Sequence, residues 1–266
     1  MTINVCVAGA TGWAGRPIAE AVLASDDLVL RSAVSRSAAG QDLGTAWGGD
    51  PLGVAVSGSV ADALGGVDVL VDYTSDEAVR ANTLAALERG VSVVIGTSGL
   101  TADDFADIER GATEAGVGVV ASGNFSLTAA MAQAAALLVA RHLPHREIID
   151  YASAGKPDAP SGTARELAEQ LGKVRPNSVD VPVERTRGRI DARGTTVAGT
   201  QVHSLRLPSF VVSTEVLFAL PDERLSIRHD AGGTPVPYVG GTLLAVRAVV
   251  GHIGLTRGLD TLLLAS

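Results

Sequence analysis

The octapeptide KPDAPSGT, Lys156 to Thr163, carries residues suited to chemistry on a small anion. It follows a strand-like run at residues 146–152, and its prolines together with Gly155 predict a loop. Ser161 is a preferred helix N-cap, so we expect a helix whose first amides, from Gly162 and Thr163, lie at the positive end of its dipole. Such a helix start binds carboxylates and phosphates, and Lys156 adds a full positive charge. The segment therefore predicts a pocket for a small acidic substrate.

Taken alone, Lys156 is also compatible with a solvated surface charge, and Ser161 with an ordinary helix cap. The whole octapeptide, however, resembles the signature loop of dihydrodipicolinate reductases, which reduce a cyclic C=N bond with NAD(P)H in lysine biosynthesis. The resemblance implies that Lys156 is catalytic and that Ser161, Gly162 and Thr163 hold a substrate carboxylate. It also implies that Arg206 lies near the substrate.

The sequence departs from that family at two places. Family members carry a histidine pair just before the loop, where this chain has Ala152 and Ser153. In the family the first histidine acts as an acid and the second contacts substrate, so we assign Ser153 to the substrate-binding set. The run Val212–Glu215 replaces a Gly-Glu-His-Thr-like run. General acid catalysis is worth about 10²–10⁴ in rate, so loss of the histidines would slow the reaction by about this factor if the substrate were unchanged.

Three explanations of this loss remain open. In the first, Lys156 donates the proton alone. Its pKa would then have to be lowered, which burial would achieve and the nearby Asp158 would oppose. Alternatively, the substrate is a different imine that arrives as a protonated or substituted iminium and needs no donor. In the third, the protein binds the cofactor without turnover. The KPDAPSGT loop favours an enzyme, because a pure cofactor-binding protein has no use for a carboxylate pocket.

A second candidate site lies at the start of the chain. The apolar run Ile3–Ala8 predicts a strand buried on both faces, and Gly9–Gly15 follows with a GxxGxxG spacing before a helix. Glycines at these positions permit a tight turn and the close approach of a pyrophosphate. We therefore predict a dinucleotide-binding turn here.

The second predicted strand, Leu28–Val34, ends in Ser35 and Arg36 without a carboxylate. At this point of a dinucleotide fold an acidic residue binds the ribose hydroxyls of NAD, whereas an arginine suits the 2′-phosphate of NADP. We therefore predict NADPH in preference to NADH. The alternative is that Arg36 is only a solvated strand terminus.

Buried strands and amphipathic helices alternate up to residue 126, which predicts a parallel sheet with ligands at the carboxyl ends of its strands. The segments GTSG and SGNFS at two of those ends also resemble loops that border the nicotinamide in the family. Residues 41–59 are glycine-rich and predict a loop with little regular structure. The predicted cofactor-binding residues are Gly9, Ala10, Thr11, Gly12, Trp13, Ala14, Ser35, Arg36, Thr74, Gly96, Thr97, Ser98, Ser122, Asn124 and Phe125.

Longer strands replace this alternation after residue 126, including a single predicted strand over residues 195–205. We therefore expect an α/β chain in which residues 1–126 form a Rossmann-like nucleotide-binding domain. Residues 127–235 are expected to form an α+β domain with a mixed sheet for substrate binding and oligomerisation. The resemblance implies that the last helix, within residues 236–266, returns to the nucleotide domain, and that the second domain's sheet builds a homotetramer.

Composition narrows the class of partner. The net charge of −8 argues against nucleic acid or an anionic membrane surface as the main partner. Cys6 is the only cysteine, the histidines have no metal-ligand spacing, and no apolar run approaches the roughly 20 residues that span a bilayer. We expect a cytoplasmic protein without a metal. The function that we predict is NAD(P)H-dependent reduction of a C=N bond in a carboxylate-bearing substrate. The alternatives are a true 4-hydroxy-tetrahydrodipicolinate reductase with Lys156 as donor, and a non-catalytic NADPH-binding paralogue.

Overall fold

The computed structural model of the protein describes residues 2–265. These residues divide into two compact units. The first contains residues 2–127 and 235–265, and the second contains residues 128–234. Each unit has its own sheet.

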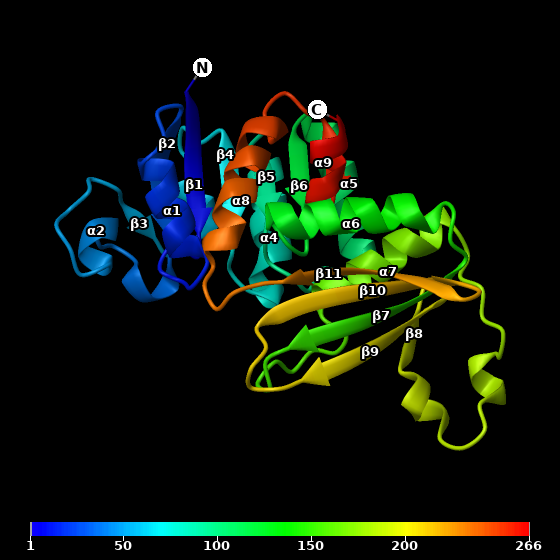
Figure 1. Cartoon of the computed structure of the whole chain (residues 1–266). Helices are drawn as coiled ribbons and strands as arrows, with labels where there is room; N and C mark the ends of the chain where they lie inside the picture. The colour runs from blue at the N-terminus through cyan, green and yellow to red at the C-terminus, as the bar shows by residue number, and fades with distance from the viewer. Residues whose placement is uncertain (1, 266) are drawn as a thin grey trace. The chain divides into compact units, whose positions relative to one another are not determined.

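The first unit is built on a seven-stranded parallel sheet with the order β12-β6-β5-β4-β1-β2-β3 (Figure 1). From β1 the chain adds β2 and β3 toward one edge of the sheet. It then returns to the other flank of β1, where β4, β5, β6 and β12 follow toward the opposite edge. The strand order therefore reverses between β1 and β4, which is where such sheets form a ligand crevice. The strands are β1 Ile3–Ala8, β2 Leu28–Val34, β3 Val56–Ser57, β4 Val69–Asp72, β5 Ser92–Ile95, β6 Gly118–Ala121 and β12 Gly254–Arg257.

Helices cover this sheet because its central strands are apolar on both faces. All four residues of β4 and of β5 are buried, as a parallel strand between two helical layers requires. Helices α1 and α8 pack together, and α4 packs against both α3 and α5. The helices of this unit are α1 Gly15–Leu23, η1 Arg36–Ala38, α2 Leu43–Ala46, α3 Val60–Ala63, α4 Asp76–Leu87, α5 Ala102–Ala115, α8 Val236–Val249 and α9 Leu259–Ala265.

The second unit has a five-stranded mixed sheet with the order β11-β10-β7-β9-β8, in which only the pairing of β7 with β9 is parallel. Its strands are β7 His145–Ala152, β8 Thr195–Val197, β9 Thr200–Arg206, β10 Val212–Leu220 and β11 Glu223–Asp230. Its helices are α6 Leu127–Ala140, whose first residue belongs to the first unit, α7 Gly162–Val174, η2 Val183–Arg185 and η3 Ile190–Arg193.

The two faces of this sheet differ. Along β7 buried residues alternate with half-buried ones, so Arg146, Ile148, Asp150 and Ala152 share the inner face. Helices α6 and α7 pack their alanines and leucines on that face, around Ile148 and Phe218. The Rossmann-like parallel sheet and the separate mixed sheet confirm the predicted fold class.

Two predicted elements were wrong in detail, and one strand was not predicted. Residues 41–59 are not a plain loop, because they contain α2 and β3. The predicted strand over residues 195–205 is a hairpin of β8 and β9, whose turn residues Ala198 and Gly199 have φ of 47° and 79°. Such left-handed turns reverse the chain between two strands. Strand β12, only four residues long, was missed. Among residues 2–265, no helix combines the length and apolar character needed to cross a bilayer.

Candidate functional site

Two glycines fix the turn between β1 and α1. Gly9 has φ of +84°, and a Cβ at this position would lie 2.3 Å from the carbonyl oxygen of Tyr73. A Cβ on Gly15 would lie 2.1 Å from the carbonyl oxygen of Gly9. The amide of Gly12 donates to that same Gly9 oxygen at 2.8 Å. At these two positions the backbone leaves no room for a Cβ, as the tight glycine turn of a dinucleotide-binding fold requires.

The end of β2 lies beside this turn. The hydroxyls of Thr11 and Ser35 are hydrogen-bonded at 2.7 Å, and Ser35 also contacts the Ser37 hydroxyl at 3.2 Å. Arg36 is exposed next to them. The pKa of Glu77 is lowered, first by a hydrogen bond from Ser75 and to a smaller extent by the charge of Arg36. Hydroxyls and a guanidinium are thus available where the adenosine ribose of a dinucleotide lies.

A buried carboxylate organises the ends of β4 and β5. Asp72 is fully buried, and its Oδ1 accepts hydrogen bonds from the amide and hydroxyl of Thr74 at 2.9 and 2.7 Å and from the hydroxyl of Thr97 at 2.9 Å. Its Oδ2 accepts from the Asn82 amide at 2.8 Å. Two of the predicted cofactor-binding residues are therefore held in place by Asp72 and Asn82, which the sequence analysis had not assigned.

The end of β6 is held by its own side chains. The Ser122 hydroxyl donates to the carbonyl of Asn124, and the Asn124 side chain accepts the amide of Ser126 at 2.8 Å. Phe125 is buried, 1% exposed. By contrast Trp13 is 57% exposed and makes an edge contact with Tyr238 of α8, with ring centroids 5.9 Å apart. Ser98 is exposed after β5.

Tyr73 ties α8 to this edge. A Cβ on Gly96 would overlap the Tyr73 ring at 2.1 Å, so only glycine leaves room for the ring at the end of β5. The Tyr73 hydroxyl bonds the Thr242 hydroxyl of α8 at 2.8 Å, and burial raises the pKa of Tyr73. The carboxyl edge of the sheet thus brings together the predicted cofactor-binding residues of β1, β2, β4, β5 and β6.

In the second unit, Ser161 begins α7 as predicted. It is the N-cap, is only 2% exposed, and its hydroxyl accepts the amide of Ala164 at 3.3 Å. Gly162 and Thr163 form the first turn, with their amides at the positive end of the helix dipole. The predicted carboxylate cradle therefore has the backbone geometry that anion binding needs.

Asp150 lies beneath this helix start and is fully buried. Its Oδ2 accepts hydrogen bonds from the Ser161 amide at 2.8 Å, the Ser204 hydroxyl at 3.1 Å and the Arg206 guanidinium at 2.9 Å. Burial would raise the pKa of Asp150, but hydrogen bonds from Ser161 and Arg206 and the charge of Arg206 outweigh it, and the pKa is lowered. Asp150 is therefore a carboxylate at neutral pH and not a proton donor.

Arg206 makes several contacts to acceptors of the protein itself. Besides Asp150, its Nη2 donates to the carbonyl of Asp158 at 2.6 Å, and its Nη1 donates to the carbonyl of Leu205 at 2.9 Å. Its Nε and the Oδ1 of Asp150 are buried and have no hydrogen-bond partner within the described chain. The predicted contact of Arg206 with substrate stays a prediction, but the residue clearly binds the loop that carries Lys156.

Lys156 forms an ion pair within its own loop. Its Nζ lies 2.8 Å from Oδ1 of Asp158, and the two side chains are 29% and 46% exposed. The amide of Lys156 donates to the carbonyl of Ser153 at 3.0 Å, which closes a turn. Ser153 is half-buried and Ala152 is fully buried. The loop therefore presents an ammonium group close to the strand end where the family's histidines would stand.

Tyr151 does not take the place of the family's histidines, because strand alternation puts its side chain on the outer face of the sheet. Its hydroxyl donates to Glu215 at 3.0 Å, and the guanidinium of Arg228 lies 4.8 Å from the centre of its ring. Within residues 2–265 no three His, Cys, Asp or Glu side chains converge as a metal-binding group.

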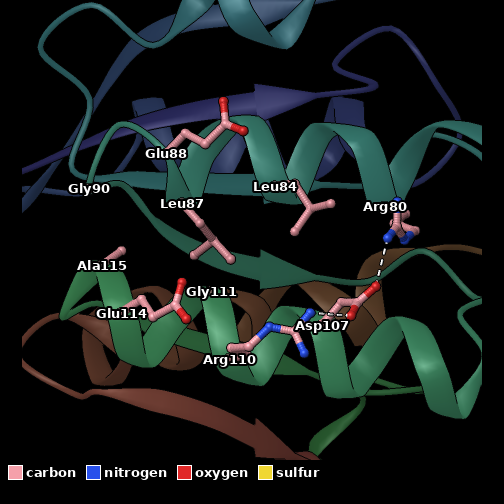
Figure 2. Close-up of a pocket in the computed structure, with 10 residues that line it drawn as sticks. All are labelled: Arg80, Leu84, Leu87, Glu88, Gly90, Asp107, Arg110, Gly111, Glu114 and Ala115. Carbon is pink, nitrogen blue, oxygen red and sulfur yellow. Dashed lines mark hydrogen bonds and ion pairs between the residues drawn. The ribbon is translucent and has the colours of Figure 1, made fainter.

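A groove of about 570 Å³ lies between α4 and α5 of the first unit (Figure 2). Leu84 and Leu87 line it, while Asp107 is paired with Arg80 at 2.7 Å and with Arg110 at 2.5 Å. Most of its lining comes from the C-terminal halves of the two helices. In a βα unit the helix runs back along the strand, so this groove lies toward the amino edge, away from the glycine turn.

A parallel sheet with a glycine turn at its switch point, in a chain that also carries a lysine loop and a helix start suited to carboxylate, defines a nicotinamide-dependent oxidoreductase. Comparison with known proteins agrees. The profile of the dihydrodipicolinate reductase N-terminus matches residues 3–125, and that of the dihydrodipicolinate reductase C-terminus matches residues 123–263.

Relatives match along the whole chain. The 4-hydroxy-tetrahydrodipicolinate reductase of Moorella thermoacetica is 37% identical over 264 residues, which cover 98% of each protein, and that of Synechococcus elongatus is 36% identical over 270 residues. The structure of the dipicolinate-bound dihydrodipicolinate reductase from Paenisporosarcina sp. TG-14 has a TM-score of 0.79 and 27% identity, and the match covers 98% of this chain and 99% of that one. The chain belongs to the dihydrodipicolinate reductase family of NAD(P)H-dependent oxidoreductases.

Proposed function

We propose that this protein is a reductase of lysine biosynthesis. Its substrate would be the cyclic imine 4-hydroxy-tetrahydrodipicolinate, after which its relatives are named. The supporting observation is family membership from end to end combined with an intact Lys156 loop and α7 start. This assignment is narrower than the general imine reduction inferred from the sequence, and it corresponds to the alternative stated there.

The cofactor fits the first unit. Gly9 and Gly15, where no Cβ fits, keep the turn tight, and the pyrophosphate would lie against the backbone amides at the start of α1. Thr74 and Thr97, fixed by Asp72, would border the reacting end. The bound nicotinamide supplies the hydride. Ser35 and Arg36 would contact the ribose, and the guanidinium of Arg36 supports NADPH as the preferred form.

The second unit's residues would bind and protonate the substrate. The amides that open α7 would hold one substrate carboxylate, and Ser161 caps the helix and is buried in the conformation that this requires. Lys156, as an ammonium paired with Asp158, carries a proton that it can donate to the imine nitrogen as the hydride arrives on carbon. Addition of one hydride and one proton reduces one double bond of the substrate and leaves the cofactor oxidised.

One observation favours a second candidate function. Ala152 and Ser153 supply no imidazole, and Tyr151 points to the opposite face of the sheet. A substrate that arrives as a pre-charged iminium needs no acid, so a related carboxylate-bearing imine fits this site as well. The pH dependence separates the two, because a pre-charged substrate gives no loss of rate at high pH from a protein acid.

The test is NADPH oxidation followed by absorbance, with dihydrodipicolinate formed in situ and with a panel of other cyclic and acyclic imino acids. Turnover with dihydrodipicolinate that falls as the pH rises supports Lys156 as donor. Turnover only with another imine supports the second function. Binding of NADPH without turnover on any imine would contradict both and indicate a cofactor-binding paralogue.

Assembly, location and the two-domain division complete the proposal. A homotetramer built by the sheet of the second unit is supported by the half-buried outer face of β7, and light scattering tests it. A cytoplasmic location is supported by the acidic charge and the single cysteine. Residues 1–126 with the returning C-terminal segment would bind the nucleotide, and residues 127–235 the substrate.

A further inference from the structure

A chain of contacts connects a buried carboxylate to the lysine that the proposed function uses. It starts at Oδ2 of Asp150 and passes to Nη2 of Arg206 at 2.9 Å. The same Nη2 donates to the carbonyl of Asp158 at 2.6 Å, and the carboxylate of Asp158 contacts the Nζ of Lys156 at 2.8 Å. The two ends of this network differ in burial, since Asp150 is fully buried and Lys156 is 29% exposed.

Asp150 also controls the other part of the loop. The oxygen that contacts Arg206 accepts the amide of Ser161, the residue that caps α7. One carboxylate oxygen thus fixes the end of the loop at the helix and, through Arg206, the middle of the loop at Asp158. Because β7 leads into the loop and β9 carries Arg206, the loop is held from the strand before it and from the neighbouring parallel strand.

The charges along the network alternate: Asp150 negative, Arg206 positive, Asp158 negative and Lys156 positive. Each charge lies beside an opposite charge or a carbonyl dipole, and removing one partner of the buried Asp150–Arg206 pair would leave the other charge uncompensated. A cation at position 206 without Asp150 would be an uncompensated charge that is largely buried, because its side chain is only 17% exposed. Asp150 therefore determines where Arg206 lies.

We propose that Asp150 is a positioning residue that, through Arg206 and Asp158, sets the place of the Lys156 ammonium relative to the α7 start. It touches neither substrate nor cofactor in this role. This role rests on the proposed function. It explains how a loop without the histidine pair keeps the Lys156 ammonium at a fixed position relative to the amides that open α7. It also gives Arg206 a function other than direct substrate binding.

The chain is well suited to a test that needs no turnover, because Lys156 and Lys173 are its only lysines. Lys173 lies in the last turn of α7, is exposed, and serves as the internal reference. We would measure the rate of reductive methylation of each lysine by mass spectrometry. Asp150→Asn should raise the ratio of Lys156 to Lys173 labelling about two- to fivefold, since an exposed ion pair contributes that much.

A binding measurement and a kinetic measurement complete the test. Asp150→Asn should weaken dipicolinate binding only slightly, because the asparagine oxygen still accepts the Ser161 amide, and should slow single-turnover hydride transfer about tenfold to a hundredfold. Arg206→Lys should reproduce both effects, because lysine keeps the charge but its shorter side chain does not carry a nitrogen as far as the Nη2 that contacts both Asp150 and Asp158. The double variant should be no worse than the single variants. Asp27→Asn, which breaks a bidentate pair with Arg247 in the first unit, is the control and should change nothing in these assays.

Several outcomes would overturn the proposal. Unchanged Lys156 labelling in folded Asp150→Asn or Arg206→Lys protein would show that the network does not hold the lysine. Additive losses in the double variant, with dipicolinate binding abolished by Arg206→Lys alone, would show that Arg206 binds substrate directly. If Asp150→Asn does not fold, the labelling of Arg206→Lys decides. If no imine is turned over, the labelling ratio still tests the network while the proposed function fails.

Discussion

Each unit of this protein has a fully buried aspartate near the end of a central strand, Asp72 on β4 and Asp150 on β7. Within residues 2–265 the groups that donate to Asp72 are all neutral: the amide and hydroxyl of Thr74, the hydroxyl of Thr97 and the side-chain amide of Asn82. Asp150 accepts from an amide, a hydroxyl and the guanidinium of Arg206. The first network therefore brings no full positive charge to its site, whereas the second does.

The difference fits the ligands that we propose for the two units. The charges of a dinucleotide would meet the backbone amides of the glycine turn and Arg36, so a neutral network that only stiffens the strand ends is sufficient at Asp72. A small dicarboxylate substrate must meet a correctly placed proton donor, and misplacement by about 1 Å costs about a hundredfold in rate. We therefore expect substitutions in the first unit to act on cofactor binding, and substitutions in the second unit to act on the rate.

The largest effect should come from Lys156→Met. Loss of a general acid is expected to lower kcat/KM for dihydrodipicolinate about 10²–10⁴-fold, while the NADPH dissociation constant, measured by cofactor fluorescence, stays the same. Lys173→Met at the far end of α7 is the matched control and should retain full activity. Equal losses in both variants, or a loss of NADPH binding, would contradict the assignment of cofactor binding to the first unit and of proton donation to the second.

The next effect should come from Gly15→Ala. The added Cβ would lie 2.1 Å from the Gly9 carbonyl, so the turn must shift. We expect NADPH affinity to fall, because the backbone amides move away from the pyrophosphate, and the free energy of unfolding to be reduced by about 1–3 kcal/mol. Gly65→Ala, with nothing within 4 Å of the new methyl, is the control. Unchanged affinity by isothermal titration would show that the cofactor does not use this turn.

A smaller effect should come from Arg36→Ala. Hydrogen bonds to charged groups are worth about 1.5–3 kcal/mol, so we expect NADPH affinity to fall at least about tenfold while NADH affinity stays nearly constant. The measurement is the ratio of kcat/KM for the two cofactors. If this ratio does not change, Arg36 is a solvated strand terminus and the predicted preference for NADPH has lost its basis.

These two networks also show which features the sequence could reveal. The turn at Gly9, the parallel sheet and the start of α7 at Ser161 follow from local rules for glycines, apolar runs and helix caps, and the structure agrees with them. Asp150 stands in an apolar strand run, IIDYA, and this unusual position was the only local signal of its role. Its partner Arg206 is 56 residues away, and no spacing rule connects the two. The break at Ala198-Gly199 was missed because alternation continues across the turn.

The smallest effect should be the pH dependence of stability that Asp150 contributes. Hydrogen bonds from Ser161 and Arg206 lower the pKa of Asp150 in the folded protein below the value of about 3.9 in an unfolded chain. Its carboxylate therefore stabilises the fold at pH values above about 4, and this contribution is lost as the pH falls through the lowered folded pKa.

Asp150→Asn should reduce the free energy of unfolding by about 1–2 kcal/mol at pH 7, and the difference from the unmodified protein should shrink when the pH is taken below about 4. Urea unfolding at a series of pH values measures this difference directly. Asp72→Asn provides the comparison, because the partners of Asp72 carry no charge and we expect no ion pair to be broken there. A difference for Asp150→Asn that stays constant down to pH 3 would mean that its carboxylate is not the group that stabilises the Lys156 loop.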